Sequence, residues 1–372
     1  MRILQTPVRF YPFIGGVENY VYNLSTELIK LDHNVTVVCA NEPICKNNEL
    51  IKKINVIRIP YIGKIANTNI TPKLPILIFK KNFDIIHTHI PTPWCADWSA
   101  IITEFKRKPL ILTYHNDIVA DGFANYIAKF YNLTSLKFVL SKAAKIIITQ
   151  PNYMASSPYL RKYKNKVEVI PNGVNVNRFS PMNVEKSDNT LFFLSVLDKF
   201  HKYKGLDKLL QALVIVKKEI KDVKLIVGGT GELLKYYKQK TISLGLKQNV
   251  FFTGFISDEK IVEYYNKCDA FVLPSISAKQ EGFGIVLLEA MACEKPIITT
   301  GIVGVANEAI DNNAGIVVPT KDTKMLANAI IKVLEDDNTA KMMGKNGRKL
   351  VENKYSWEKV AKMMDDVYRG LA

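Results

Sequence analysis

The sequence predicts an α/β fold with two domains, each built on a parallel sheet that helices cover on both faces. Three observations support this prediction. The 372 residues suffice for two sizeable cores. Short apolar segments alternate with helical or irregular stretches along most of the chain, as in doubly wound sheets. The turn-forming cluster 171–175, followed by polar residues up to Asn189, divides this pattern in two. We therefore expect one domain over 1–174, completed by a last helix over 356–372, and another over 175–355.

The first domain begins with a strand, a glycine turn and a helix. Arg2–Thr6 is apolar, Gly15 and Gly16 lie in the turn, and Val17–Leu31 has helical periodicity. The glycine pair lacks the spacing of a dinucleotide-binding turn, which disfavours an NAD site. Later strands of this domain are expected at Val35–Cys39, Val56–Ile59, Asp84–Thr88, Leu110–Tyr114, Lys145–Thr149 and Val167–Ile170.

The second domain repeats the alternation, and an amphipathic helix spaced on Trp357, Val360, Met364 and Tyr368 ends the chain. In such folds ligands bind at the carboxyl ends of the strands, so the loops that follow them are the first places to search. The strands expected here are Thr190–Leu197, Val223–Gly228, Val250–Thr253, Ala270–Leu273, Pro296–Thr300 and Gly315–Val318.

The stretch from Pro274 to Pro296 is the most informative part of the sequence. Between Ile285 and Cys293 every residue is apolar except Glu289, which predicts a buried helix whose carboxylate needs a partner. Glu281 lies eight residues earlier, and Gly282 and Gly284 allow a ligand to approach the backbone where the helix begins. A helix start attracts a phosphate, and a carboxylate suits a vicinal diol. The alternative is that Glu289 faces a polar seam and Glu281 is an ordinary loop acid.

Histidines follow two expected strands of the first domain. His115 comes directly after Leu110–Tyr114, where α/β sites form, so it is a candidate for chemistry. His87 and His89 have a spacing that can suit a metal, but no acid or cysteine close in sequence completes a ligand set. We therefore expect hydrogen-bonded histidines there and no metal site.

Basic and glycine-rich turns follow two strands of the second domain. Lys199, Lys202 and Lys204 lie in one loop, and Gly205 opens the helix after it, so these lysines can contact phosphate oxygens. A solvated lysine loop is the alternative. Gly229 lies in the next strand-to-helix turn. The sequence contains no Asp-x-Asp motif, so charge neutralisation would fall to lysines and backbone N–H groups.

Charge and composition narrow the class of protein without deciding it. The net charge is +16, and residues 1–175 carry 22 Lys and Arg against 11 Asp and Glu. Such a field favours nucleic acid, an anionic membrane or phosphorylated small molecules, and a genome bias toward lysine is the plain alternative. The scattered five cysteines indicate reduced thiols. No apolar run spans a bilayer and no signal-peptide layout precedes the first strand, so we expect a cytoplasmic location.

Taken in order, these motifs resemble the retaining GT-B glycosyltransferases of glycosyltransferase family 4, and the resemblance covers essentially the whole chain. The matching motifs are Gly15-Gly16-Val17-Glu18, Thr113-Tyr114-His115-Asn116, Pro171-Asn172-Gly173-Val174, Lys204-Gly205, Gly229-Thr230-Gly231-Glu232 and the stretch from Glu281 to Glu289. The resemblance implies two facing Rossmann-like domains with a cleft between them. It also implies a retaining, metal-independent enzyme of the hexosyltransferase kind, without a cofactor, that uses a UDP- or GDP-sugar in cell-surface polysaccharide, glycolipid or glycoprotein glycan synthesis.

The same resemblance implies roles for particular residues. Glu289 would hold the ribose diol, Lys204 the diphosphate, and Glu281 with the backbone of Gly282, Phe283, Gly284 and Ile285 the sugar and phosphate. Gly15, Gly16 and His115 would approach the transferred sugar. The turn with Phe255 and Ile256 would line the base, and Gly229 would also contact the donor. Many members carry Gly-Arg-Leu where this chain has Ser195-Val196-Leu197, so Lys199 or Lys202 is the candidate substitute for that arginine.

The acceptor is expected to be a carbohydrate or a lipid-linked sugar. Aromatic residues and lysines alternate between Tyr126 and Lys142 like an interfacial helix, so contact with the inner face of a membrane is a hypothesis. A cleft-lining helix is its alternative. Rival functions are a GT-B epimerase or phosphorylase, a silent nucleotide-sugar sensor, and a nucleic-acid-binding protein. No nucleic-acid-binding motif supports the last of these, so we expect no nucleic acid partner.

Overall fold

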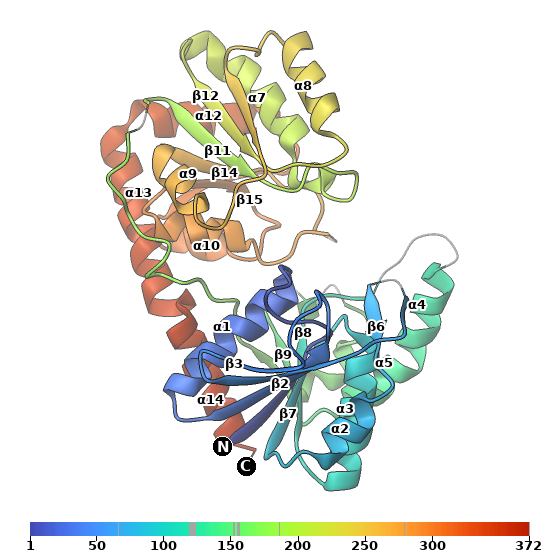
Figure 1. Cartoon of the computed structure of the whole chain (residues 1–372). Coiled ribbons are helices and arrows are strands. Elements are labelled where there is room, and N and C mark those ends of the chain that lie inside the picture. Colours follow the sequence, from blue (N-terminus) through green and yellow to red (C-terminus); the bar gives the residue numbers. More distant parts are fainter. Residues whose placement is uncertain are drawn as a thin grey trace. The chain divides into compact units, whose positions relative to one another are not determined.

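The computed structural model describes residues 1–65, 67–118, 124–151, 153–154, 157–185, 187–278 and 280–371. The chain divides into two compact units, one formed by 1–172 with 357–372 and the other by 173–356 (Figure 1). The sequence predicts the joints after residues 174 and 355, whereas the two units divide after 172 and 356. Both units are α/β with Rossmann-like parallel sheets.

The sheet of the first unit has the order β10-β9-β8-β7-β1-β2-β4-β3, and all its strand pairs are parallel except β3 with β4. Its strands are β1 (Arg2–Thr6), β2 (Asn34–Ala40), β3 (Asn48–Ile51), β4 (Ile54–Ile59), β7 (Ile85–Ile90), β8 (Leu110–Tyr114), β9 (Lys145–Ile148) and β10 (Val167–Val169). A small antiparallel pair, β5 (Gly63–Ile65) and β6 (Thr68–Ile70), stands apart from it. The sequence patterns predicted neither β3 nor this pair, because short edge strands lack a clear apolar alternation.

Helices cover both faces of this sheet. One face packs against α1 (Gly16–Lys30) and α14 (Trp357–Arg369), which lie side by side (Figure 1). The other face packs against four helices: α2 (Leu74–Lys80), α3 (Pro93–Lys106), α4 (Ala124–Leu133) and α5 (Ser135–Lys142). The apolar residues of each strand alternate between these two cores, as a doubly covered parallel sheet requires.

The sheet of the second unit has the order β13-β12-β11-β14-β15-β16, with every pair parallel. This is the dinucleotide-fold order 3-2-1-4-5-6. The strands are β11 (Thr190–Leu194), β12 (Lys224–Gly228), β13 (Val250–Gly254), β14 (Ala270–Leu273), β15 (Ile297–Thr300) and β16 (Gly315–Val318). The strand predicted to reach Leu197 ends at Leu194, since the chain turns there into the basic loop.

The helices of the second unit enclose one large core. They are α7 (Leu206–Glu219), α8 (Leu234–Ser243), α9 (Ile261–Lys267), α10 (Ile285–Ala292), α11 (Ala306–Asp311), α12 (Thr323–Glu335) and α13 (Asp337–Leu350). Short turns of other helical types lie at Lys202–Lys204 and Val351–Tyr355, and a further one at Arg161–Lys166 belongs to the first unit. The order of the sheet places a switch point between the neighbouring strands β11 and β14, whose connections run to opposite sides.

Candidate active site

The second unit gathers its candidate residues at this switch point. The chains that leave β11 and β14 run in opposite directions, and folds of this kind bind their ligands at the carboxyl ends of two such strands. Lys204 lies in the loop after β11, and Glu281 lies in the loop after β14. The fold therefore brings together two residues that are 77 positions apart in the sequence.

Lys204 and Glu281 form a largely buried ion pair. The Lys204 ammonium donates to both oxygens of Glu281, with Nζ–Oε1 at 2.8 Å and Nζ–Oε2 at 3.0 Å. The side chain of Glu281 is 1% exposed and that of Lys204 is 17% exposed. The Ser275 hydroxyl and the Gly282 backbone N–H also donate to the carboxylate. Glu281 is therefore held rigidly, and one N–H of Lys204 remains for a ligand.

A close approach of two loops produces this pair. The Ile276 N–H donates to the Tyr203 carbonyl at 2.8 Å, which joins the loop after β14 to the loop after β11. Gly205 has a φ of +84° and touches the Pro274 carbonyl so closely that a Cβ would lie 2.0 Å from its oxygen. A glycine is required at this contact by both its conformation and its space.

Glu289 has the partner that its position on an apolar helix predicted. The Tyr265 hydroxyl of α9 donates to Glu289 Oε2 at 2.6 Å. Burial outweighs this hydrogen bond and raises the pKa of Glu289 to about 7. Near neutral pH both the protonated and the ionised form of Glu289 are therefore present. An ionised Glu289 can accept hydrogen bonds from both hydroxyls of a vicinal diol.

The Glu289→Gln variant is expected to be more stable than the wild type above pH 7, with a gain that shrinks as the pH falls. The raised pKa means that folded Glu289 keeps its proton between about pH 4.5 and pH 7 while the unfolded chain loses it. Wild-type stability therefore falls with rising pH over that range, and glutamine cannot ionise. Thermal melts of both proteins at pH 5 and pH 8 measure the difference. A Tm gap independent of pH would contradict a raised pKa.

The helix start beside Glu281 is shaped by glycine. Gly284 caps α10 with a φ of +83°, and a Cβ there would lie 2.4 Å from Cγ1 of Val303. The Ile285 N–H belongs to the first turn of α10, where helix N–H groups lack helical partners. The Gly282 N–H already donates to Glu281 at 3.1 Å. The Phe283 ring lies in the core against Tyr355, at 5.6 Å between ring centroids, so only its backbone can serve a ligand.

Gly229 serves the packing of two turns. Its N–H donates to the Gly254 carbonyl at 2.8 Å, and a Cβ would lie 1.8 Å from the Ser195 carbonyl oxygen. Gly229, the residue expected to contact the nucleotide-sugar, thus already uses its backbone N–H within the fold. Phe255 is 74% exposed, whereas Ile256 packs beneath Gly228.

The two lysines proposed as arginine substitutes differ in their surroundings. Lys199 is exposed, with its Nζ 3.9 Å from Glu232 Oε1. The ammonium of Lys202 lies 5.5 Å from the ring centre of Tyr236. Neither contact fixes a lysine firmly, so both side chains can reorient toward an anion.

The first unit places His115, which is half-buried, beside the rings of His89 and Tyr20. Its Nε2 lies 3.3 Å from Nδ1 of His89, and its ring meets Tyr20 edge to face at 5.0 Å between centroids. Burial lowers the pKa of His115 to about 4, so the imidazole is neutral near pH 7. His87 and His89 are completely buried and hydrogen-bonded within the fold, as expected.

Gly15 and Gly16 begin α1, with Gly15 at its N-cap. A Cβ on Gly15 would lie 2.2 Å from Oε2 of Glu18, a buried carboxylate that pairs with Arg9 at 3.3 Å. The positive end of α1 thus already has an acid of its own. Nothing is seen within 4 Å of a Cβ built on Gly16.

Sequence reasoning missed the residues that hold the candidates in place. Ser275 directs Glu281, Tyr265 directs Glu289, and Gln5 contacts His89. Ser275 could have been found, because it follows the end of β14 by two residues. Tyr265 and Gln5 carry no signal of this kind, since each lies inside a helix or strand and meets its partner only through the tertiary fold.

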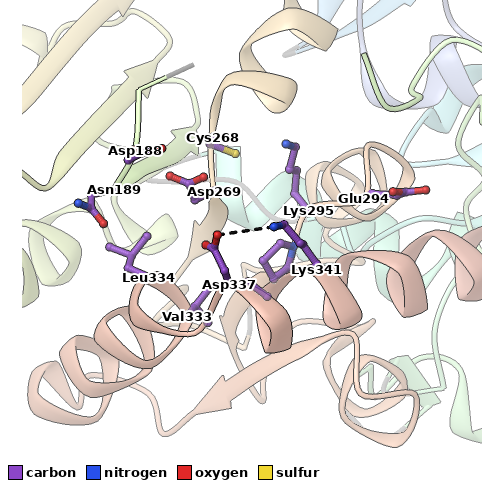
Figure 2. Close-up of a pocket in the computed structure, with 12 residues that line it drawn as sticks. Asp188, Asn189, Cys268, Asp269, Glu294, Lys295, Val333, Leu334, Asp337 and Lys341 are labelled. Carbon is purple, nitrogen blue, oxygen red and sulfur yellow. Dashed lines mark ion pairs between the residues drawn. The ribbon is translucent and has the colours of Figure 1, made fainter. Parts of the chain in front are cut away.

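A cavity of about 400 Å³ in the second unit lies elsewhere (Figure 2). Its lining residues directly precede the strands β11, β14 and β15: Asp188, Asn189, Cys268, Asp269, Lys295 and Pro296. It is therefore at the amino ends of the strands, whereas Lys204 and Glu281 follow their carboxyl ends. Asp337 and Lys341, one turn apart on α13, pair at its rim at 3.6 Å. Among the described residues no cluster of three or more His, Cys, Asp or Glu side chains could hold a metal.

Comparisons with known proteins agree with this fold. Residues 14–178 match the family model "Glycosyltransferase Family 4", and residues 178–350 match "Glycosyl transferases group 1". The chain belongs to glycosyltransferase family 4 and has the GT-B fold.

Relatives of known name align with nearly the whole chain. An O-antigen chain mannosyltransferase C of Escherichia coli is 28% identical, over 100% of this chain and 98% of the relative. A phosphatidyl-myo-inositol mannosyltransferase of Mycobacterium leprae is 27% identical, over 96% and 94%. The structure of Anabaena Alr3699/HepE in complex with UDP has a TM-score of 0.77 at 19% identity and covers both chains completely. The protein is thus a glycosyltransferase.

Proposed function

We propose that the protein moves a sugar from a nucleotide-diphosphate sugar to a hydroxyl group of a growing polysaccharide or a lipid-linked acceptor, with retention of the anomeric configuration and without a metal. The observation that carries this proposal is the Lys204–Glu281 ion pair at the switch point of the second unit. The pair sets one cation and one fixed carboxylate beside the start of α10. A diphosphate needs the cation, and the hydroxyls of a sugar need the carboxylate.

The roles of the residues follow from these surroundings. The free N–H of Lys204 and the first N–H groups of α10 attract the diphosphate, and Glu289 accepts the ribose diol. Glu281, whose oxygens accept from Lys204, Ser275 and Gly282 in the free protein, accepts from the transferred sugar in exchange for part of these bonds. The bond from the anomeric carbon to the phosphate oxygen breaks, the acceptor oxygen bonds to that carbon on the same face, and the leaving phosphate takes the acceptor proton. Catalysis consists of positioning and of stabilising the leaving diphosphate, without a covalent intermediate.

Two measurements test the proposed function. Calorimetric titration with UDP-, GDP- and ADP-sugars identifies the donor, and HepE with its UDP makes a uridine nucleotide the first to try. NMR of the product then reads the anomeric configuration, with chelator in the reaction. Inversion, or a need for added metal, would refute those parts of the proposal. Turnover without an acceptor or with phosphate as acceptor would favour an epimerase or a phosphorylase.

A lipid-linked acceptor would explain why exposed apolar side chains are unevenly distributed over the first unit. We propose that the helices α2 to α5 rest on an anionic membrane at its inner face. Large apolar residues are exposed on these helices, whereas α1 and α14 expose none among their described residues. The exposed side chains are Ile76, Phe79, Phe105, Tyr126, Ile127, Phe130, Leu133 and Phe138.

Charge complementarity supports the membrane as the partner of this surface. The four helices carry five lysines and two acids. Of the acids, Asp97 accepts a hydrogen bond from Tyr131 at 2.9 Å, and Glu104 pairs with Lys142 at 2.8 Å. Lysines beside exposed aromatic rings suit an anionic lipid surface. No helix in the described part of the chain is long and apolar enough to cross a bilayer.

The Ile127→Ser/Phe130→Ser variant is expected to bind anionic vesicles at least about tenfold more weakly than the wild type, since each side chain loses on the order of 1 kcal/mol of burial. Sedimentation with anionic vesicles at low salt measures the binding. The double variant Ile242→Ser/Phe251→Ser, which removes two exposed apolar residues of the second unit, is the matched control and should bind like the wild type. If the wild type itself does not sediment, the helices only line the substrate site.

A further inference from the structure

A line of buried polar side chains crosses the first unit from α14 to His115. Gln5 on β1 faces His87 in the parallel register, and His89 faces Thr113 on β8. All four side chains are completely buried, at 0% exposure. Polar groups this deep are costly to bury unless each finds a suitable partner, so their hydrogen bonds report where the protons are.

The central link is the amide of Gln5. Its Oε1 lies 3.1 Å from Nε2 of His89, and its Nε2 lies 3.3 Å from Nδ1 of His87. In this orientation of the amide its oxygen only accepts, so Nε2 of His89 carries a hydrogen. Burial lowers the pKa of His89 well below its usual value, so this imidazole is neutral. Its Nδ1 therefore has a lone pair.

The lone pair on Nδ1 of His89 determines which nitrogen of His115 carries the hydrogen. His89 Nδ1 lies 3.3 Å from His115 Nε2, and a neutral acceptor requires a donor opposite. Nε2 of His115 therefore carries the hydrogen and donates a hydrogen bond to Nδ1 of His89. The remaining nitrogen of the neutral ring, Nδ1, keeps the lone pair of His115.

The contacts of His87, on the other side of Gln5, agree with the same orientation of the Gln5 amide. The Gln5 NH₂ group donates to His87 Nδ1, and the Tyr368 hydroxyl of α14 lies 2.7 Å from that same nitrogen. His87 thus has its hydrogen on Nε2, which lies 2.7 Å from the Thr113 hydroxyl. Each of these contacts has one donor and one acceptor under a single assignment of protons.

We propose that Gln5 and His89 are positioning residues: they hold His115 as the Nε2–H tautomer, so that its Nδ1 accepts a hydrogen bond from a hydroxyl of the bound sugar or acceptor. The role given to Nδ1 rests on the proposed glycosyl transfer, whereas the tautomer itself does not. A ring with the opposite tautomer would present an N–H at Nδ1 and could not accept from a hydroxyl.

The tautomer can be measured without substrate. The chain has five histidines, and long-range ¹H–¹⁵N spectra of protein with labelled histidine distinguish protonated from bare ring nitrogens. At pH 7 we expect His89 and His115 both with hydrogen on Nε2 and none on Nδ1. A His115 with its hydrogen on Nδ1, or on both nitrogens, would overturn the proposal even if transfer activity is found.

Variants test the positioning role. His89→Leu is expected to lower kcat about 100-fold through loss of the His115 orientation, with little change in donor Kd. His89→Asn sets an amide oxygen where Nδ1 lies and should restore most of the activity and the Nε2–H signal of His115. His33→Asn is the control, because it removes another buried imidazole of this unit, bonded to Asp365 of α14 at 2.8 Å, and should alter neither.

The results separate the two proposals. Equal loss in His89→Leu and His89→Asn with an unchanged His115 tautomer would show that the line serves packing alone and would overturn the positioning role. A wild type that transfers no sugar while showing the expected tautomers would count against the proposed function only.

Discussion

The Glu281→Ala variant is expected to lose sugar transfer by about 100- to 1000-fold while it remains folded. Glu281 is the fixed carboxylate of the site, and removal of one preorganised polar group from an active site typically costs a factor of this size. The change also leaves the Lys204 ammonium, which is 17% exposed, without its partner. We therefore expect a loss of stability as well, on the order of 1–3 kcal/mol.

Transfer assays and thermal melts of three variants separate these two effects. Glu281→Gln keeps the volume and can still accept from Lys204, so it should melt close to the wild type and still transfer poorly. Glu263→Ala removes one partner of the ion pair with Lys267 on α9 and should leave transfer unchanged. Near-normal transfer by Glu281→Gln would show that the charge of Glu281 is not used in the reaction.

The Gly205→Ala variant is expected to be strongly destabilised, by about 2–5 kcal/mol, and to bind donor poorly. Its left-handed backbone costs an L residue about 1–2 kcal/mol, and the new Cβ would lie 2.0 Å from a backbone oxygen that cannot move aside alone. The two loops that bring Lys204 to Glu281 must then separate.

Gly245→Ala is the matched control for this variant. Gly245 also has a positive φ, +70°, but nothing lies within 4 Å of its built Cβ. It should therefore show the backbone cost alone. Chemical denaturation of both variants measures the difference, and equal destabilisation would mean that the contact with Pro274 is unimportant.

The sequence predicted the fold well because the strands are short apolar runs with clear ends. β1, β8, β14 and β16 have the expected bounds, and the others that were predicted differ by at most a few residues. The strand after the linker was drawn three residues too long, since Ser195 to Leu197 continue its apolar pattern while the chain already turns. The short strands β3, β5 and β6 were missed because only one or two residues of each are apolar, so no apolar run marks them.

The site was predictable only where spacing along the chain carries the signal. Glu281, Gly284 and Glu289 belong to one segment, so their relation follows from helix geometry. The Lys204–Glu281 pair depends on which strands are neighbours, and β11 and β14 are separated in sequence by β12 and β13. The directions of the hydrogen bonds around Gln5 depend on three strands and a helix, and no local pattern contains them.

The helix α14 also bears on the order in which the protein takes shape during synthesis. Its Trp357, Val360, Met364 and Tyr368 complete the core beside α1, yet they are translated after the entire second unit. A ribosome delivers residues 173–356 before it delivers α14, and domains fold as their chains emerge. The second unit can therefore fold first. Until α14 is synthesised, the apolar side chains of α1 that pack against it lack their cover and need protection.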